Sequence, residues 1–391
     1  MERLKPVVFH DAWGSFVSIA SLQGRSIPSP EPESELWMGA HESGPSGVEG
    51  PGALTLADVI AADPEGELGG ACVARSGPRL PFLLKVLAAG RALSIQAHPT
   101  AERARALRAD SGGSDDVYVD DEAKPEMLVA LAPFEVFVGL REPAVVAAIA
   151  DRLRVPRFQL IVDAAGTAAD PAHALLAEVL AVPAGERTAF VREVVRACVR
   201  LEASSDPVGH ACAAVVRVAE DHPDDIGLAV LLLMQHRVLE PGEFLDVPPG
   251  VLHAYVRGLG IEVLANSDNV VRAGLTEKAV NVEELLRVVD SRAPGGAGRS
   301  DAIEDGVELF RSSSDRFQLH RLSASSPVAL PGDGGPRIVF CLRGSAVLHG
   351  PADRLGLGRA ESAFVPAREE GVTVSGPGEV YVVSCPLPAA P

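Results

Sequence analysis

The chain has 391 residues, of which 47% are hydrophobic and 23% charged, a composition that is ordinary for a globular protein of two or three domains. Its net charge of −18 argues against nucleic acid or an anionic membrane surface as a partner, and no apolar run is long enough to span a membrane. The five cysteines form no CxxC pair, which indicates reduced thiols in a cytoplasmic protein and no cysteine-based metal site.

The first hundred residues mix short strands and short helices. Val7–Phe9 and Phe16–Ile19 are predicted as strands because they are rich in β-branched and aromatic residues. Thr55 is an N-cap signal for a short helix, and residues 100–109 are strong helix formers that begin with a threonine cap.

Lys85 interrupts the apolar strand predicted over Leu80–Leu87. A lysine inside such a run is costly unless its ammonium reaches water or an anion. Either the side chain extends to solvent from a strand edge, or it faces a polar site.

The stretch Leu93–Pro99 is also predicted as a strand, because apolar and polar residues alternate and Pro99 ends the run. Side chains at alternate positions share a face, so Ser94, Gln96 and His98 are expected to point the same way. This row of polar groups indicates the floor of a polar site, and a polar face that only meets solvent is the alternative. Lys124–Leu131 is a further strand, with charges at its start.

From residue 143 to 236 the composition favours an all-helical insertion between two β regions. Helical spacing is present in three segments, Pro143–Leu153, Ala172–Leu180 and Glu186–Leu201, and Asp225–Gln235 could be a further helix. Strands return over Glu240–Val247, Gly250–Val256 and Ile261–Ala265, followed by a helical stretch at Val282–Val289.

Residues 291–300 are rich in glycine and include Pro294, so they are predicted as a linker. Short strands at turn-punctuated intervals then predict an all-β sandwich or barrel: Val307–Phe310, Phe317–Leu322, Arg337–Leu342, Ala346–Leu348 and Val380–Val383.

Gly242, Pro248, Gly250 and His253 match the pattern G-x5-P-x-G-x2-H, which is the second motif of cupin proteins. The glycines and proline suit two turns, after which His253 enters the barrel on the next strand. A single histidine on a strand is more often structural, but this spacing favours a metal ligand.

A cupin metal site needs ligands from facing strands of one barrel. The candidates are Gln96, His98, Glu126 and His253. This mixed nitrogen and oxygen set suits catalytic zinc, and manganese or iron could also bind.

Seven stretches together resemble the type I mannose-6-phosphate isomerase family over nearly the whole chain: Ala12–Ser15, Glu35–His41, Leu80–Leu87, Leu93–Pro99, Lys124–Met127, Pro249–Tyr255 and Asn266–Lys278. The resemblance implies a mainly β protein with two cupin-type jelly-roll barrels and an α-helical insertion. The expected units are a discontinuous catalytic barrel (residues 1–142 and 237–290), a helical domain (143–236) and a metal-free C-terminal barrel (291–391).

The resemblance also implies one Zn²⁺ per chain, bound by the four candidate ligands, and interconversion of mannose 6-phosphate and fructose 6-phosphate through a cis-enediol. The catalytic residues that it implies are Arg272, Lys124, Asp268 and Glu262. The substrate-binding residues that it implies are Ser94, Lys85 and Lys278. Without the resemblance, any one of Glu262, Asp268, Arg272 and Lys278 would be interpreted as part of a solvated loop with surface ion pairs. The residue that acts as base stays open.

Ala123 departs from the family pattern, which has histidine before Lys-Pro-Glu. If that histidine helps to open the sugar ring, another group must do so here, such as Asp268, or opening is spontaneous. A non-catalytic sugar-phosphate-binding cupin and an isomerase of another sugar phosphate are the alternatives. A sugar phosphate is the expected partner, and the chain is expected to be a monomer.

Overall fold

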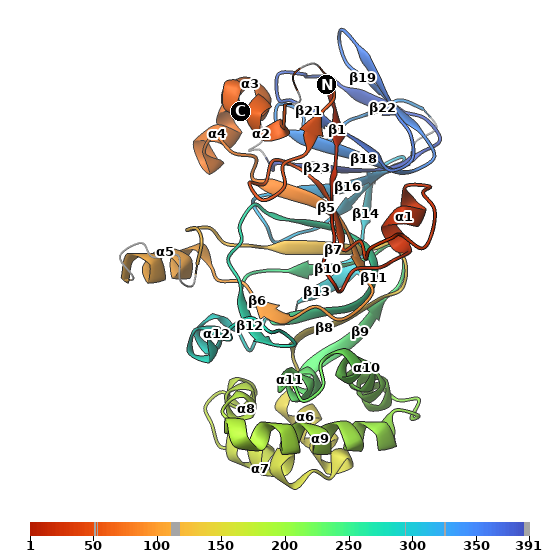
Figure 1. The fold of residues 1–391 in the computed structure, drawn as a ribbon. Helices are drawn as coiled ribbons and strands as arrows, with labels where there is room; N and C mark the ends of the chain where they lie inside the picture. Colours follow the sequence, from red (N-terminus) through yellow and green to blue (C-terminus); the bar gives the residue numbers. More distant parts are fainter. Residues whose placement is uncertain (51, 53, 111–117, 294, 324–325, 387–391) are drawn as a thin grey trace.

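The computed structural model describes all residues except 51, 53, 111–117, 294, 324–325 and 387–391. Figure 1 shows an elongated molecule with a group of helices at one end, β-sheets through the middle and further sheets at the other end. All strand pairs recorded among the described residues are antiparallel. Helix and strand are both abundant, so the description "mainly β" is too narrow and the fold is mixed.

The central sheet contains eleven strands within the described part of the chain. Its main path is β13 (Gly296–Arg299), β10 (Glu243–Val247), β7 (Glu126–Ala130), β11 (His253–Ala265), β5 (Phe82–Ala89), β3 (Glu35–Met38) and β2 (Val7–Phe9). Four more strands join it: β6 (Ile95–Ala97), β8 (Phe134–Leu140), β9 (Met234–Leu239) and β12 (Val271–Gly274). Every residue of β5 and of β7 is buried, so these strands lie in the interior of the molecule.

Strand β11 is the longest of this sheet and pairs with β5 and β7 near its end and with β6 and β8 near its start. A β-bulge lies between Tyr255 and Arg257. His253 and Glu262 are an odd number of residues apart and would point to opposite faces of a regular strand. The extra residue of the bulge shifts that alternation, so both side chains can face the same interior.

The second sheet, toward the other end of Figure 1, follows the order β14 (Asp301–Glu304), β15 (Val307–Phe310), β16 (Gln318–Leu322), β23 (Glu379–Ser384), β18 (Arg337–Arg343), β21 (Glu361–Val365), β1 (Glu2–Lys5) and β4 (Gly47–Val48). A smaller sheet contains β17 (Val328–Ala329), β22 (Thr373–Ser375), β19 (Ala346–His349) and β20 (Arg354–Leu357). The N-terminal strand β1 is therefore built into a sheet whose other strands come mostly from residues 301–384.

The helices at the lower end of Figure 1 are α6 (Pro143–Leu153), α7 (Pro156–Ala165), α8 (Pro171–Leu180), α9 (Ala184–Leu201), α10 (Pro207–Asp221) and α11 (Gly227–Leu233). Proline stands in the first turn of four of them, where its missing N–H costs nothing. Asp170 and Asp206 cap α8 and α10 by accepting backbone N–H bonds. Their buried apolar faces form one core that continues into the central sheet.

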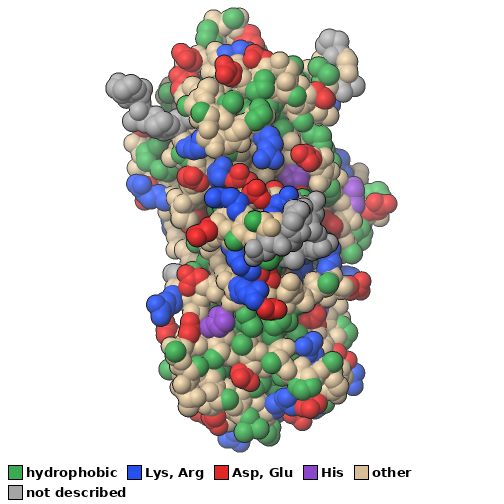
Figure 2. Space-filling model, turned by 90° about the vertical axis from the view of Figure 1, so that its left-hand side faces the viewer, with side chains coloured by type: hydrophobic (Ala, Val, Ile, Leu, Met, Phe, Trp, Pro, Cys, Tyr) green, Lys and Arg blue, Asp and Glu red, His purple; other side chains and the backbone are tan. Residues whose placement is uncertain are grey.

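The remaining helices lie beside the sheets: α1 (Ser18–Leu22), α2 (Leu56–Ala62), α3 (Pro64–Leu68), α4 (Gly70–Ser76), α5 (Ala101–Asp110) and α12 (Val282–Val288). Thr55 caps α2 as predicted, and Thr100 accepts the Arg103 N–H at the start of α5. None of the described helices is both long and apolar enough to cross a membrane. Figure 2 views the side that carries α5 and shows Lys and Arg side chains gathered around its middle.

Three local predictions were wrong. Phe16–Ile19 is not a strand, because Ser18 begins α1 and the Ser15 hydroxyl accepts the N–H groups of Val17 and Ser18. Leu93–Pro99 forms a strand only at Ile95–Ala97. The predicted linker 291–300 contains β13, which pairs with β10, while Pro294 lies outside the described residues.

Candidate metal centre and its pocket

His98, Glu126 and His253 form a buried group that could hold a metal ion, with their ligand atoms all within 4.8 Å of one another. The carboxylate of Glu126 lies between the imidazoles, 3.3 Å from Nε2 of His98 and 3.3 Å from Nε2 of His253. The Gln96 amide lies 3.3 Å from the same nitrogen of His253. The structure thus brings together the four predicted ligands.

Strand pairing explains this convergence. Gln96 on β6 stands opposite His253 on β11 and, on its other side, opposite Arg272 on β12. Directly opposed residues on neighbouring antiparallel strands project to the same face. Ligands far apart in the sequence are therefore placed side by side, with an arginine at the end of the row.

Both imidazoles are oriented by backbone carbonyls. Nδ1 of His98 donates to the Asn269 carbonyl at 2.7 Å, and Nδ1 of His253 donates to the Val251 carbonyl at 3.0 Å. Each Nε2 therefore keeps its lone pair, which is the arrangement that metal-ligating histidines need. Nε2 of His98 and Oε2 of Glu126 are buried without a hydrogen-bond partner, so the site fits a cation.

Electrostatics keep these ligands in their metal-binding forms. Burial lowers the pKa of His98, which favours the neutral imidazole. Burial would raise the pKa of Glu126, but its interactions with His98, Lys124 and His253 outweigh this effect and hold that pKa well below its usual range. The Lys124 ammonium lies 3.3 Å from Oε1 of Glu126.

A second row crosses β3, β5 and β11, where Trp37, Lys85 and Glu262 stand opposite one another. The Lys85 ammonium lies 3.2 Å from Glu35, 3.7 Å from Glu262 and 4.6 Å from the centre of the Trp37 ring. Burial would lower the pKa of Lys85, but these carboxylates raise it. Burial raises the pKa of Glu262 to about 8, against the opposing effect of Lys85.

The other predicted residues lie around this centre. Arg272 is half-buried, its pKa is lowered by burial, and its guanidinium has no hydrogen bond or ion pair with the described residues. Ser94 is half-buried just before β6, and Lys278 is exposed in the loop after β12. Neither has a recorded contact with the four candidate ligands.

Asn269 links the loop after β11 to the segment before β7. Its amide nitrogen donates to the carbonyls of Asp120 and Glu122, and its amide oxygen accepts the N–H groups of Val119 and Asp120. The backbone carbonyl of the buried Asn269 accepts the hydrogen bond from His98. This residue therefore connects a candidate ligand to the segment before Lys124.

Asp268 lies at a cavity of ≈ 510 Å³, together with His41. His41 Nε2 is 3.4 Å from Asp268 Oδ1, and this contact is the main cause of the lowered pKa of Asp268. The sequence reasoning assigned no role to His41, Glu35 or Asn269. His41 and Glu35 belong to the stretch Glu35–His41, but no spacing links His41 to Asp268 or Glu35 to Lys85.

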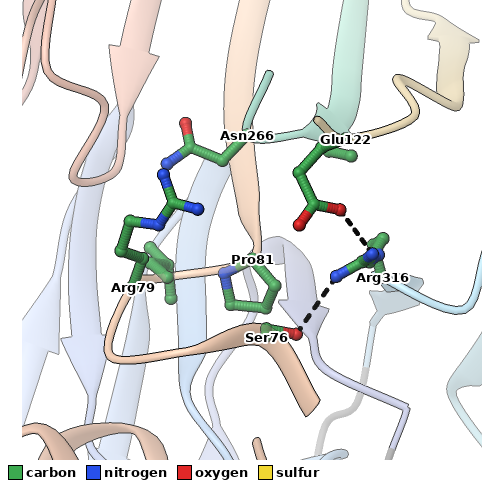
Figure 3. A pocket seen from close by; sticks show the side chains of 8 residues that line it. Ser76, Arg79, Pro81, Glu122, Asn266 and Arg316 are labelled. Carbon is green, nitrogen blue, oxygen red and sulfur yellow. Dashed lines mark hydrogen bonds and ion pairs between the residues drawn. The ribbon is translucent and has the colours of Figure 1, made fainter. Parts of the chain in front are cut away.

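A neighbouring small pocket shares Arg79 and Asn266 with this cavity. In Figure 3 the side chains of Arg79 and Asn266 lie against each other, and Arg316 reaches both Glu122 and Ser76. The Arg316–Glu122 contact measures 2.5 Å and joins the chain after β15 to the segment that carries Lys124.

These features define a group that could hold one metal ion on an antiparallel sheet, and a partly open cavity whose lining includes Arg79 and the carboxylates of Glu42, Asp120 and Asp268. The model of the phosphomannose isomerase type I catalytic domain matches residues 1–143. Mannose-6-phosphate isomerase from Escherichia coli K12 is 34% identical over 97% of this chain and 98% of its own length. The chain belongs to the mannose-6-phosphate isomerase family.

Solved structures agree with this assignment. A variant of phosphomannose isomerase from Salmonella typhimurium has a TM-score of 0.89 at 31% identity, covering 99% of this chain and all of its own. A zinc-bound mannose 6-phosphate isomerase has a TM-score of 0.87 at 30% identity, with 99% of each chain covered.

Proposed function

We propose that this chain is a zinc-dependent isomerase that interconverts mannose 6-phosphate and fructose 6-phosphate. The observation that carries the proposal is the buried group of His98, Glu126 and His253, with Arg272 one strand away and without a partner among the described residues. Gln96, His98, Glu126 and His253 would hold one Zn²⁺. When bound, the ion supplies a Lewis acid that orients and polarises sugar oxygens.

The reaction moves a proton between C2 and C1 of the open-chain sugar. A positioned base must remove a weakly acidic C–H, and positive charge must meet the negative charge that develops. Arg272 supplies that charge. Lys124 and Glu262 are the groups that move protons, since the first is cationic beside Glu126 and burial raises the pKa of the second to about 8.

Substrate binding is assigned to Ser94, Lys85 and Lys278. Lys85 already balances two carboxylates, so it suits the sugar hydroxyls better than the phosphate. Lys278 is exposed, and its flexible ammonium suits the phosphate dianion. Asp268 is assigned to ring opening, because Ala123 has no group that can carry a proton.

The proposed units are two cupin-type jelly-roll barrels, formed by residues 1–142 with 237–290 and by residues 291–391, and a helical domain over residues 143–236. The antiparallel sheets and the helices at one end support this division. Two strands cross it, because β1 pairs with β21 and β13 pairs with β10. The active species is proposed to be a monomer with one zinc ion.

A coupled assay for fructose 6-phosphate formed from mannose 6-phosphate tests the proposal. Turnover should be lost with a chelator and restored by zinc. Arg272→Ala should retain zinc and lose about 10²–10³-fold in kcat. Arg257→Ala, which removes an exposed arginine of β11, is the matched control and should stay active. Tight zinc binding without turnover would instead identify a non-catalytic sugar-phosphate binder.

A further inference from the structure

His41 and Asp268 meet at the wall of the ≈ 510 Å³ cavity. His41 follows β3 and Asp268 follows β11, and both strands pair with β5. The contact of 3.4 Å between Nε2 and Oδ1 therefore joins two loops at the same end of the central sheet.

The surroundings of His41 decide which nitrogen carries its proton. The Ser43 N–H donates to Nδ1 at 3.1 Å, so Nδ1 is the acceptor and the proton of the neutral ring lies on Nε2. Trp37 packs edge-on against the imidazole, with ring centroids 5.1 Å apart and planes at 76°. With only 8% of its side chain exposed, His41 is held with its N–H toward Asp268.

Asp268 is the accessible member of the pair, with 50% of its side chain exposed. The bond from His41 uses one carboxylate oxygen and leaves the other available to a molecule in the cavity. Lys124 and Lys85 are close enough for their charges to lower the pKa of Asp268 as well. The carboxylate is therefore ionised at neutral pH and can accept a proton.

Opening a closed aldose requires such an acceptor. The O1–H proton leaves, C1=O1 forms, the C1–O5 bond breaks, and O5 takes up a proton. A carboxylate can take the proton from O1, and the carboxylic acid so formed can return it to O5. Atoms and charges then balance without a further reactant.

We propose that His41 is a positioning residue for ring opening: its Nε2–H holds Asp268 in the orientation in which the carboxylate passes the proton from O1 to O5. This rests on the proposed function and extends it, because it assigns to His41 the support that Asp268 needs where Ala123 offers no imidazole. Among the described residues that line this cavity, His41 is the one histidine.

Two rates measured on the zinc-loaded protein test the proposal. Magnetisation transfer between the α and β anomers of mannose 6-phosphate labelled with ¹³C at C1 reports ring opening, and the coupled assay reports isomerisation. His41→Ala should slow enzyme-catalysed anomer exchange about 10²-fold while zinc content is unchanged. His41→Gln, which retains a side-chain N–H donor, should recover most of the loss.

A double-mutant cycle separates positioning from a general structural effect. If His41 acts through Asp268, then His41→Ala combined with Asp268→Asn should lose no more anomer exchange than Asp268→Asn alone. The matched control is His236→Ala. It removes the imidazole of His236 on β9, which lies 2.8 Å from Glu135 on β8, and it should leave both rates unchanged.

Normal anomer exchange in His41→Ala would overturn the proposal, as would additive losses in the cycle or no recovery by His41→Gln. Failure of the proposed function looks different, because the unmodified protein would then show no turnover of mannose 6-phosphate at all.

Discussion

The two ring nitrogens of each candidate histidine ligand have different partners. His98 and His253 each use Nδ1 on a backbone carbonyl and present Nε2 to Glu126. This orientation is fixed before any cation arrives, so little rearrangement is needed on binding.

Removing one imidazole should therefore empty the site. His253→Ala is expected to reduce bound zinc from about one per chain to nearly none, because three protein ligands and an open position are the minimum for catalytic zinc and Gln96 is a weak neutral donor. Metal analysis of the dialysed protein measures the ratio, with His236→Ala as the control. A His253→Ala protein that keeps its zinc would remove this residue from the ligand set.

Lys85 gives a stability prediction at the same scale. Lys85→Met should cost about 3–5 kcal/mol in the free energy of unfolding, because the Glu35 carboxylate would remain buried beside an uncharged side chain. Urea unfolding measures the cost. Lys85→Met with Glu35→Gln should recover part of it, and equal stabilities for the single and double variants would contradict the ion-pair account.

Single residues were predictable where a local pattern carries the information. The turn motif before His253 predicts this residue as a ligand, and the apolar residues around Lys85 predict that burying its charge is costly. His41 was not predictable as a partner of Asp268, because the contact depends on two loops that only the folded sheet brings together. Glu35 was not predictable as the partner of Lys85 either, because this contact depends on the pairing of β3 with β5.

Among the elements, the loop after β11 has the largest effect on the site. Asn269 is fully buried and bonds the backbone of residues 119–122 while its carbonyl holds His98. The loop therefore acts as a clamp between a candidate ligand and Lys124.

Loosening this clamp should weaken metal binding without removing a ligand. Asn269→Ala is expected to lower zinc affinity about 10–100-fold, because the loop whose backbone carbonyl orients His98 loses its side-chain hydrogen bonds to residues 119–122. Competition with a chromogenic chelator measures the affinity. Asn281→Ala is the matched control, since it removes the N-cap of α12 instead. Equal affinities for these two variants would show that the clamp does not support the metal centre.

Element prediction succeeded where the residue pattern of a segment is clear. Helix α6 has the predicted bounds, and β15 starts and ends where predicted. The strand at Phe16–Ile19 failed because the Ser15 hydroxyl caps a helical turn that β-propensity does not register. Strand β13 was missed because its pairing with β10 uses backbone groups, which a glycine-rich sequence supplies without any side-chain pattern.

For the whole molecule, the buried His320 contributes to the response to acid. Burial lowers the pKa of His320, in β16, to about 4 from the ordinary 6.5, and its Nδ1 has no hydrogen-bond partner. The unfolded chain takes up this proton at a higher pH than the folded chain does. The stability contributed by neutral His320 is thus fully present above pH 6.5 and is lost as the pH falls toward 4.

The difference between the two pKa values corresponds to about 3 kcal/mol. His320→Phe should therefore flatten the decline of the unfolding free energy between pH 6.5 and 4 by about this amount. Urea unfolding of the zinc-free protein at several pH values measures the slope. His10→Phe, at an exposed position, should leave the slope unchanged. An unchanged slope in His320→Phe would place the acid sensitivity elsewhere.

The pairing of β1 with β21 joins Glu2–Leu4 to Ser362–Phe364. During synthesis on the ribosome β21 is translated roughly 20–70 s after β1 at ordinary elongation rates. Until then β1 lacks this partner and presents an open edge that can pair with a neighbouring nascent chain. Completion of this sheet is therefore a late event in folding, and the yield of native protein should depend on how well chaperones shield β1 while translation proceeds.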